Sequence, residues 1–516
     1  MTEFAPDTRK DTLDKDLDKL VVVEEATSFV ARGLVAPGLA LLFLALSAVI
    51  AALFALGEPR AVIIIAAAAI GGYMALNIGA NDVANNVGPA VGAKALTMGG
   101  ALAIAAIFES AGALIAGGEV MNTVARGIVD PAAMSNSSDF IRLMMAALIS
   151  SALWVNLATW IGAPVSTTHA VVGGVVGAGA TAAGISVVNW GMLSGIAASW
   201  VISPLLGGVI AALFLAFVKS AIIYQDDKIS AARRWVPLLV AIMAGAFAAY
   251  LATKGLRRVV HLSGFQIALL GIGSFALAWG WSHIRVRRLS HGMENRNQSL
   301  RKLFNLPLIC SAALLSFAHG ANDVANAVGP LAAIVQAASG GGFGGAVGVP
   351  LWVMAIGAVG ISLGLVLFGP KLIRMVGEQI TKLNPMRAFC VALSAAITVI
   401  VASWFGLPVS STHIAVGAVF GVGFFREWYT ANSSRRRAYM ERKASRARAA
   451  RETSPEKPVQ SDDLESDGPP ISREEIARRK LVRRAHVTTI AAAWVTTVPA
   501  SALLAAMTYL LLDALA

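Results

Sequence analysis

Cysteine and charge are both scarce in this chain of 516 residues. The two cysteines, Cys310 and Cys390, each lie in an apolar run, so a disulfide framework is not expected, and no group of Cys and His has zinc-ligand spacing. Charged residues make up only 14% of the sequence, whereas hydrophobic residues make up 56% and the mean hydropathy is +0.68. This balance argues against a soluble domain and indicates a protein that crosses the membrane several times.

The sequence also lacks the period-2 alternation in ten-residue units that a lipid-embedded β-barrel needs. The N-terminus, MTEFAPDTRKDTLDKDLDKL, is polar and partly acidic, so a cleavable signal peptide is not expected. Present instead are apolar runs long enough to cross a bilayer as helices, such as 36–56, 145–163 and 352–369. We therefore predict an all-α polytopic membrane protein with about 12–13 membrane segments, located in the cytoplasmic (inner) membrane.

Basic residues are unevenly distributed along the chain. The net charge is +12, but 16 of the 42 Lys and Arg residues lie within 426–485. A basic segment between spans is typical of a cytoplasmic loop, with binding to anionic membrane lipid as the alternative, so nucleic acid is not an expected partner. Residues 452–470, which are rich in Pro, Ser and acidic side chains, are expected to be disordered.

Two motifs occur twice in the same order. GANDVANNVGP at 79–89 returns as GANDVANAVGP at 320–330, with ten of eleven positions identical. PVSTTHAVVGG at 164–174 returns as PVSSTHIAVGA at 408–418, with seven of eleven positions identical. An internal duplication of this kind is typical of transporters built from repeats.

The duplication predicts a division of the chain into two repeats, a linker and additional segments. A weaker similarity supports this division: the segments ASWVISPLLGG and AAWVTTVPASALLAA each contain a Trp followed by a helix-interrupting Pro. The predicted parts are a cytoplasmic N-terminal tail (1–35), an extra span (36–56), repeat one (57–220), a linker with two spans (221–302), the first part of repeat two (303–425), a basic, partly disordered cytoplasmic loop (426–485) and the final span (486–516).

The two repeats are predicted to be inverted relative to each other. If each apolar segment crosses once, seven crossings separate equivalent points. The basic residues mostly agree: loop 118–140 of repeat one holds only Arg126, whereas 371–387 of repeat two holds four basic residues. This arrangement leaves the N-terminus inside and the C-terminus outside. The basic segment 254–258 is an exception, because it would lie on the external side.

Both motifs place poor helix formers in the middle of a span. GAND and PVST are each expected to interrupt a helix, and irregular backbone at membrane depth is tolerated only where protein or a polar cavity satisfies it. Broken helices are therefore predicted near the bilayer midplane. Pro164 and Pro408 would each start a new helix, which would place the following hydroxyls at helix N-termini, where free N–H groups and the helix dipole favour an anion.

Asp82 and Asp323 need a positive partner in this setting. An ionised Asp at mid-membrane costs on the order of 2.5–3.5 kcal/mol, and none of the four motifs contains Lys or Arg. Carboxylate and Asn oxygens suit a small hard cation, so we predict that a cation and an oxyanion bind together. Protonated phosphate can donate a hydrogen bond to a carboxylate and sulfate cannot, which mildly favours phosphate.

GANDVAN followed by PVSTTH or PVSSTH in both halves resembles the inorganic phosphate transporter family, the PiT-type symporters, over roughly 60–220 and 303–514. The resemblance implies an inverted-repeat helical fold, often dimeric, that takes up phosphate with sodium ions or protons, or as a metal phosphate complex in some bacterial members. Carried over by position, the ligands of sodium or another cation would be Asn81, Asp82, Asn85, Asn322, Asp323 and Asn326, and the phosphate ligands would be Asp82, Asp323, Ser166, Thr167, Thr168, Ser410, Ser411 and Thr412.

Some polar residues do not follow the twofold pattern. Asn86 is matched by Ala327, and Glu109 is a lone intramembrane carboxylate whose counterpart would lie near Ala358. Glu109 could bind a proton or an extra cation, or it could have a partnered structural role. His169 and His413 could relay protons, although neutral histidines hydrogen-bonded to backbone are favoured.

The function that these observations predict is secondary active transport rather than catalysis. A Ser and His nucleophile in STTH is set aside, because adjacent helical positions do not face each other. We expect a symporter that imports inorganic phosphate with sodium ions or protons, with no covalent cofactor, with divalent metal as a further candidate cargo, and as a homodimer in lipid. A sulfate or other oxyanion permease and a non-translocating phosphate receptor are the alternatives.

Overall fold

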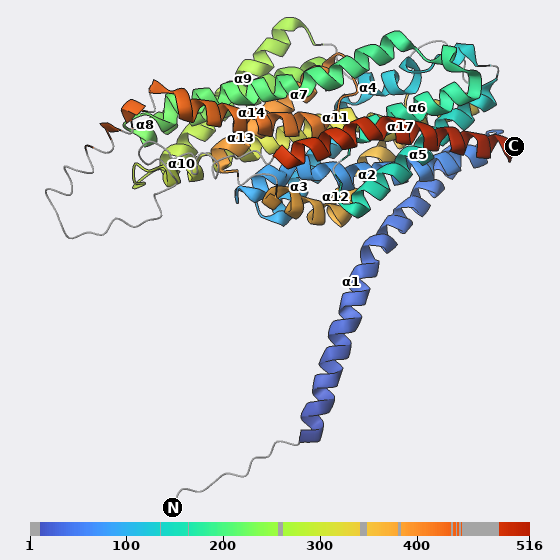
Figure 1. Cartoon of the computed structure of the whole chain (residues 1–516), viewed down its shortest axis with the longest axis horizontal. Helices are drawn as coiled ribbons and strands as arrows, with labels where there is room; N and C mark the ends of the chain where they lie inside the picture. The colour runs from blue at the N-terminus through green and yellow to red at the C-terminus, as the bar shows by residue number, and fades with distance from the viewer. Residues whose placement is uncertain are drawn as a thin grey trace, which may run out of the picture.

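The computed structural model describes residues 11–134, 136–163, 165–255, 262–340, 348–379, 383–434, 437–439, 441–442, 445 and 484–515. Most of these residues form helices that pack lengthwise into a bundle, from which the N-terminal part of the first helix projects (Figure 1). Within the described residues the only β pairing is an isolated bridge between Val129 and Val188. The helices are α1 (Asp11–Phe54), α2 (Ala61–Gly92), α3 (Met98–Ala116), α4 (Gly118–Asn122), α5 (Ser137–Ile161), α6 (Thr167–Ala183), α7 (Trp190–Val218), α8 (Lys228–Tyr250), α9 (Gly264–Leu289), α10 (Asn297–Leu303), α11 (Asn305–Ala338), α12 (Leu351–Gln379), α13 (Pro385–Trp404), α14 (Ser411–Asn432) and α17 (Arg484–Ala514).

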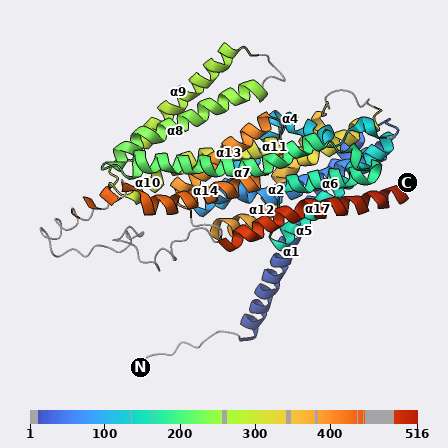
Figure 2. The same ribbon diagram turned by 45° about the horizontal axis from the view of Figure 1, so that its top comes forward.

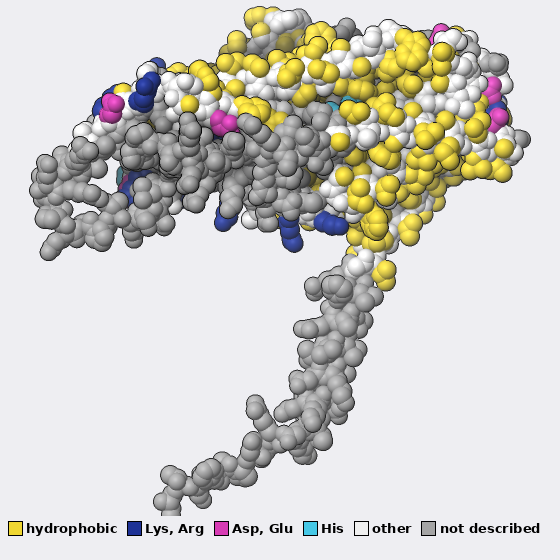
Figure 3. Space-filling view, in the orientation of Figure 1, with side chains coloured by type: hydrophobic (Ala, Val, Ile, Leu, Met, Phe, Trp, Pro, Cys, Tyr) yellow, Lys and Arg dark blue, Asp and Glu magenta, His cyan; other side chains and the backbone are white. Residues whose placement is uncertain are grey.

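Eleven of these helices are long and apolar enough to cross a membrane, as judged by length and composition. These helices confirm the predicted all-α polytopic fold within the described part of the chain, and the predicted number of 12–13 membrane segments stays a prediction. Hydrophobic side chains cover the middle of the surface, and Lys and Arg gather toward the end that holds α8 and α14 (Figure 3). The helices α8 and α9 pair with each other and diverge from the rest of the bundle (Figure 2).

Two of the eleven long helices do not run the full length of their neighbours. Arg60, just before α2, donates hydrogen bonds to Ser137 and Ser138 at the start of α5. Asn81, about two-thirds of the way along α2, donates to Thr159 near the end of α5, so α5 ends at about that level of α2. The chain then turns, and α6 runs back against α5. The expectation that every apolar segment crosses once stays a prediction for this hairpin, because α5 is long and apolar enough to cross a membrane.

The helices α13 and α14 form the matching hairpin in the second half. Asn322, in the middle of α11, donates to Ser403 near the end of α13, as Asn81 donates to Thr159. The turns of the two hairpins meet, because the Thr168 hydroxyl donates a 3.0 Å hydrogen bond to the Val409 carbonyl. The helix breaks predicted at PVST thus correspond to two hairpin turns that meet in the interior.

The helix breaks predicted at GAND are absent. Both α2 and α11 continue without interruption through Asp82 and Asp323. The glycines serve close packing instead: a Cβ atom at Gly79 would lie 1.9 Å from the carbonyl oxygen of Ile361, and one at Gly320 would lie 2.0 Å from that of Glu109. Only glycine permits this approach between backbones, so the residue that weakens the isolated helix brings two helices together.

The same kind of contact joins the two halves elsewhere. Glycines on α6 meet the backbone of α17, and the equivalent glycines on α14 meet the backbone of α7. The second helix of each hairpin therefore packs against the last long helix of the other half. In both contacts, glycines four residues apart meet backbone positions four residues apart. The distances from an added Cβ atom to the facing carbonyl oxygen are Gly173 to Val498, 2.6 Å; Gly177 to Ala502, 2.1 Å; Gly417 to Pro204, 2.2 Å; and Gly421 to Gly208, 2.0 Å.

Equivalent residues also meet directly. Gly112 on α3 lies against Phe317, and Gly364 on α12 lies against Leu76, which makes α3 and α12 equivalent with an offset of 252 residues. Ser110 and Ser362 differ by this same offset, and their hydroxyl oxygens are 2.6 Å apart. A pseudo-twofold axis thus passes between these two serines.

Several predictions concern residues outside the described part of the chain. These are the disorder of 452–470, most of the basic loop 426–485, the first ten residues of the N-terminal tail, and Pro164. Pro408 is described, and it does not start a helix: it lies three residues before α14, because the hydroxyl of Ser410 caps that helix by accepting from His413 N–H. The predicted domain limits, the inverted orientation of the repeats and the sidedness of the loops stay predictions.

Candidate functional site

The two motif pairs meet in the interior of the bundle. Asp82 lies in the middle of α2 and Asp323 in the middle of α11, while the hydroxyl residues lie in the hairpin turns and the first turns of α6 and α14. Every predicted site residue is at most 8% exposed, so the site is closed to solvent in this conformation.

Both carboxylates accept hydrogen bonds from hairpin hydroxyls. Asp82 accepts from Thr167 at 3.0 Å through Oδ2 and from Thr412 at 2.9 Å through Oδ1. Asp323 accepts from Ser411 at 3.0 Å through Oδ2. Because Thr167 and Ser411 are equivalent, these two contacts repeat across the halves, whereas the bond from Thr412 crosses from one half to the other.

The asparagines of the motifs extend the network between the halves. Asn85 donates to Thr412 at 2.9 Å, and its equivalent Asn326 donates to Thr168 at 3.1 Å. Asn85 and Asn326 thus orient hydroxyls of the hairpins, and they lie within continuous helices and not at helix breaks. The structure therefore brings the predicted residues of all four motifs into one polar cluster.

Two of the predicted phosphate ligands have another role here. Ser166 and Ser410 are the N-caps of α6 and α14, where their hydroxyls accept from the backbone N–H of His169 and His413. A serine at this position stabilises the start of a helix and leaves the neighbouring N–H groups directed toward the cluster. The hydroxyls best placed to contact a ligand are therefore those of Thr167, Thr168, Ser411 and Thr412, one to two residues further on.

Several buried oxygens of the cluster have no hydrogen-bond donor among the described residues. They include Oδ1 of Asn81, Asn326 and Asp323. Buried oxygens without a donor are costly, and such atoms are typical ligands of a cation. No Lys or Arg of the described ranges forms an ion pair with Asp82 or Asp323. The basic side chain beside both is His319, which is a cation when protonated, so a proton or a bound cation is the expected compensation.

One residue that the sequence reasoning missed lies at the centre of the cluster. His319, one helical turn before Asp323, is fully buried, and its Nε2 lies 2.9 Å from Asp323 and 3.6 Å from Asp82. Its Nδ1 lies 3.3 Å from Glu109. A comparison of the repeats would have shown the signal, because the equivalent position in the first half is Ile78.

Glu109 joins the same cluster from α3. One of its oxygens accepts a 2.7 Å hydrogen bond from Asn86, and the other faces His319. The glycine contacts place its counterpart at Ile361, three residues beyond Ala358. Glu109 thus has two polar partners, which fits both of the roles considered for it.

The rings of His169 and His413, which follow the hydroxyl residues of the two hairpins in sequence, pack against each other. Their ring centroids are 4.4 Å apart in an edge-to-face arrangement, and Trp200 lies against His169 at 3.8 Å. The Trp200 indole N–H donates to the carbonyl of Pro408, so this side chain contacts both hairpin turns. The two histidines therefore lie where the hairpins meet.

Comparisons with known proteins agree with this geometry. A sequence profile of the phosphate transporter family matches residues 78–505. A Helicobacter pylori (strain J99) protein named "Putative phosphate permease" is 48% identical over 95% of this chain and 97% of its own length, and one of the same description from Pyrococcus abyssi is 36% identical over 71% and 89%. A solved structure described as "The sodium-dependent phosphate transporter" has a TM-score of 0.74 and 32% identity, and covers 88% of this chain and 100% of its own.

Proposed function

Because the chain belongs to the phosphate transporter family, we propose that it is a symporter that imports inorganic phosphate across the cytoplasmic membrane with sodium ions or protons. The observation that supports this best is the convergence of Asp82 and Asp323 with hydroxyls from both hairpins in one buried cluster. Carboxylates from two full-length helices and helix N-termini from two hairpins provide for ions of opposite sign in the same place.

In this proposal the hydroxyls and N–H groups at the hairpin turns bind phosphate. The four hydroxyls are those of Thr167, Thr168, Ser411 and Thr412, at the starts of α6 and α14, where the helix dipoles favour negative charge. Two of these hydroxyls donate to Asp82, so their contact with phosphate would exchange one set of hydrogen bonds for another.

Coupling cations would bind at the carboxylates and the amide oxygens. The oxygens that lack a donor belong to Asn81, Asn326 and Asp323, and they come from both halves. Sodium is the first choice, since the solved relative of 32% identity is described as sodium-dependent. Moving each negative charge inward costs about 2.3 kcal/mol per 100 mV, so at least two monovalent cations must accompany a dianion to remove that cost.

Alternating access would come from movement of the hairpins relative to α2 and α11. The two turns contact each other through Thr168 and Val409, and each hairpin is attached to the last long helix of the other half. Opening on one side would separate one turn from the cluster while the other stays in place. Inverted repeats would supply two related conformations for this movement.

Uptake of labelled phosphate into proteoliposomes tests the proposal. We expect accumulation that requires an inward sodium or proton gradient, loss of that accumulation in D82N and D323N, and no loss in E294Q, which removes an exposed carboxylate. Competition by unlabelled sulfate as strong as by phosphate would identify a general oxyanion permease. Phosphate binding without accumulation would identify a receptor and reject the symporter.

A further inference from the structure

An apolar cavity lies outside the polar cluster, between α7 and α8. Its volume is about 400 Å³. The lining residues recur at helical spacing on both walls, from Ile210 to Phe217 on α7 and from Trp235 to Ile242 on α8, and all of them are hydrophobic or aromatic. The two helices diverge from the turn that joins them (Figure 2), and the cavity lies in the angle between them. This cavity is named the α7–α8 crevice.

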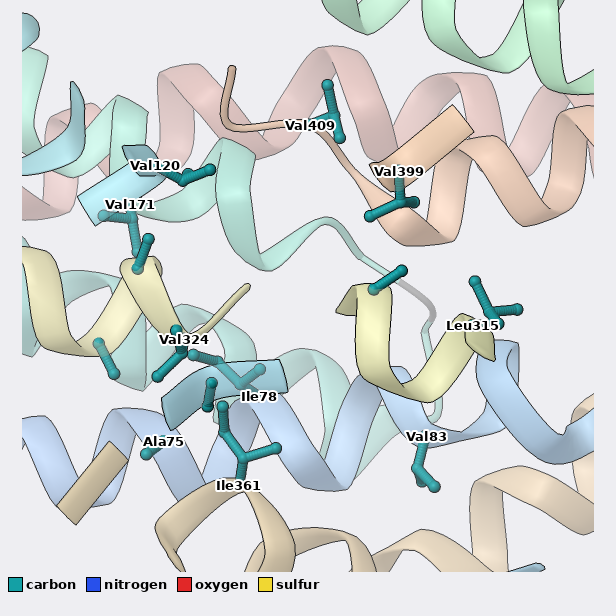
Figure 4. Close-up of a cluster of buried hydrophobic side chains, with 14 of the residues drawn as sticks. Ala75, Ile78, Val83, Val120, Val171, Leu315, Val324, Ile361, Val399 and Val409 are labelled. Atoms are coloured by element: carbon teal, nitrogen blue, oxygen red, sulfur yellow. The ribbon is translucent and has the colours of Figure 1, made fainter. Parts of the chain in front are cut away.

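The crevice contrasts with the filled interior of the bundle. Figure 4 shows part of that interior, where Ile78 and Ile361 are fully buried among other apolar side chains. In the crevice, Leu213 is 64% exposed and Ile242 is 51% exposed, so the cavity opens at the surface of two membrane-spanning helices. Walls without polar groups do not retain water, and they suit a hydrocarbon chain.

Arg234 lies at the end of the crevice nearest the turn between the two helices. It comes one helical turn before Leu238 on the same face of α8, and its guanidinium carbon lies 5.3 Å from the centroid of the Trp235 ring. That ring packs edge-to-face on Phe217, with 5.0 Å between centroids. A positive charge is therefore held directly beside the apolar walls.

The Arg234 side chain is exposed, and no carboxylate pairs with it in the part of the chain that the structure describes. The two acidic residues nearest in sequence have other partners, because Asp227 caps the start of α8 and Asp226 forms a 3.7 Å ion pair with Arg442. The adjacent Arg233 donates two hydrogen bonds to the end of α9. Arg234 is thus the basic group at the crevice that can bind an external anion.

A guanidinium group beside an apolar crevice matches the two parts of a charged lipid. We infer that the α7–α8 crevice binds one anionic phospholipid, such as phosphatidylglycerol, with an acyl chain between the helices and the phosphate at Arg234. Arginine can donate two parallel hydrogen bonds to a phosphate. Anionic headgroups bind at basic sites between membrane helices, and Lys and Arg gather at this end of the bundle (Figure 3).

The crevice is small for a helix of another protein. A helix about 10–12 Å across would fill this volume with roughly one turn, whereas an acyl chain is thin enough to lie along both walls. The crevice shares no residue with the polar cluster around Asp82 and Asp323, so lipid binding is independent of the proposed transport.

Native mass spectrometry of the full-length protein in detergent can measure lipid binding. Dioleoyl phosphatidylglycerol should fill one site per chain about fivefold more tightly than dioleoyl phosphatidylcholine, whose headgroup has no net charge. R234Q should weaken phosphatidylglycerol binding at least about tenfold, because it removes hydrogen bonds to a charged group. Inorganic phosphate, which has no acyl chain, should not displace the lipid.

A second variant tests the acyl chain separately from the headgroup. L213W keeps the arginine and should also weaken binding, because the indole ring takes up space in the crevice. The matched controls are R285Q and L269W, since both residues are exposed on α9, which contributes no residue to the crevice. Both controls should leave the affinity unchanged.

Three results would overturn the lipid site: equal affinity of the wild type for the two lipids, unchanged affinity in both R234Q and L213W, or displacement of the lipid by inorganic phosphate. A lipid-free dimer that L213W converts to monomers would also overturn it, and would identify the crevice as a contact between copies of this chain. Phosphate uptake is a separate readout. Its absence in protein that binds the lipid would reject the proposed symport and leave the lipid site intact.

Discussion

The hydroxyl of Thr412, in the second half of the chain, donates a 2.9 Å hydrogen bond to the carboxylate of Asp82 in the first half. The same hydroxyl accepts from Asn85, one turn further along α2. The side chain of Thr412, in the first turn of α14, thus links the second hairpin to α2. In the proposed function, this contact would make the binding of phosphate at the hairpin sensitive to the charge on Asp82.

Replacement of Thr412 tests this connection. T412A should raise the KM for phosphate roughly 10- to 150-fold, because a hydrogen bond to a charged group contributes about 1.5–3 kcal/mol. T412S keeps the hydroxyl and should restore most of the affinity. Initial uptake rates over a range of phosphate concentrations measure the effect, and equal KM values for T412A and T412S would contradict the assigned role.

The two aspartates should differ in their effects although the motif repeats them. Asp82 accepts from two hydroxyls, whereas Asp323 accepts from one and lies closer to His319, at 2.9 Å against 3.6 Å for Asp82. We expect D82N to lower phosphate affinity more than D323N, and D323N to change mainly the dependence on the coupling cation. Because neither variant is expected to accumulate phosphate, equilibrium binding of phosphate to the purified variants at several sodium concentrations separates the two effects. Identical profiles for both variants would show that the site is functionally symmetric.

Close backbone contact at Gly320 should make this position intolerant of a side chain. A Cβ atom there would lie 2.0 Å from the Glu109 carbonyl oxygen, so G320A should cost more than the 1–3 kcal/mol typical of about one extra methylene. The matched control is G273A on α9, where nothing lies within 4 Å. Thermal unfolding in detergent compares them, and a G320A protein as stable as G273A would disprove the packing argument.

Trp200 should support the contact between the hairpin turns. W200F keeps a ring against His169 but loses the 3.1 Å hydrogen bond to Pro408. The loss of a neutral hydrogen bond worth about 0.5–1.5 kcal/mol predicts roughly a two- to tenfold reduction in phosphate uptake. W200A, which removes the ring as well, should have a larger effect. An unchanged rate in both variants would mean that this contact does not contribute to transport.

The doubled motifs were sufficient to predict which residues converge. Asp82, Asp323 and the hydroxyls of both hairpins could be identified because intramembrane polar groups are costly and these occur twice. His319 escaped detection because it lies just before the repeated segment and has no polar equivalent. The continuous helices could not be foreseen, because the glycines are explained by contacts with residues more than 200 positions away.

How far each helix extends along its neighbours was another property that the sequence could not predict. Hydropathy gives α5 the length of a full crossing, and only the contact between Asn81 and Thr159 shows that it ends about two-thirds of the way along α2. The assembly state and the sidedness of the loops depend on partners and on a bilayer that hydropathy does not describe. They stay predictions.

The attachment of α6 to α17 has a consequence for biosynthesis. The helix α6 emerges from the ribosome about 300 residues before the segment whose backbone its glycines contact. During that interval the nascent first half must remain in the bilayer with the face around Gly173 and Gly177 uncovered. Synthesis of α17 therefore has to precede this contact, and a chain truncated before α17 should unfold more readily than the chain that contains it.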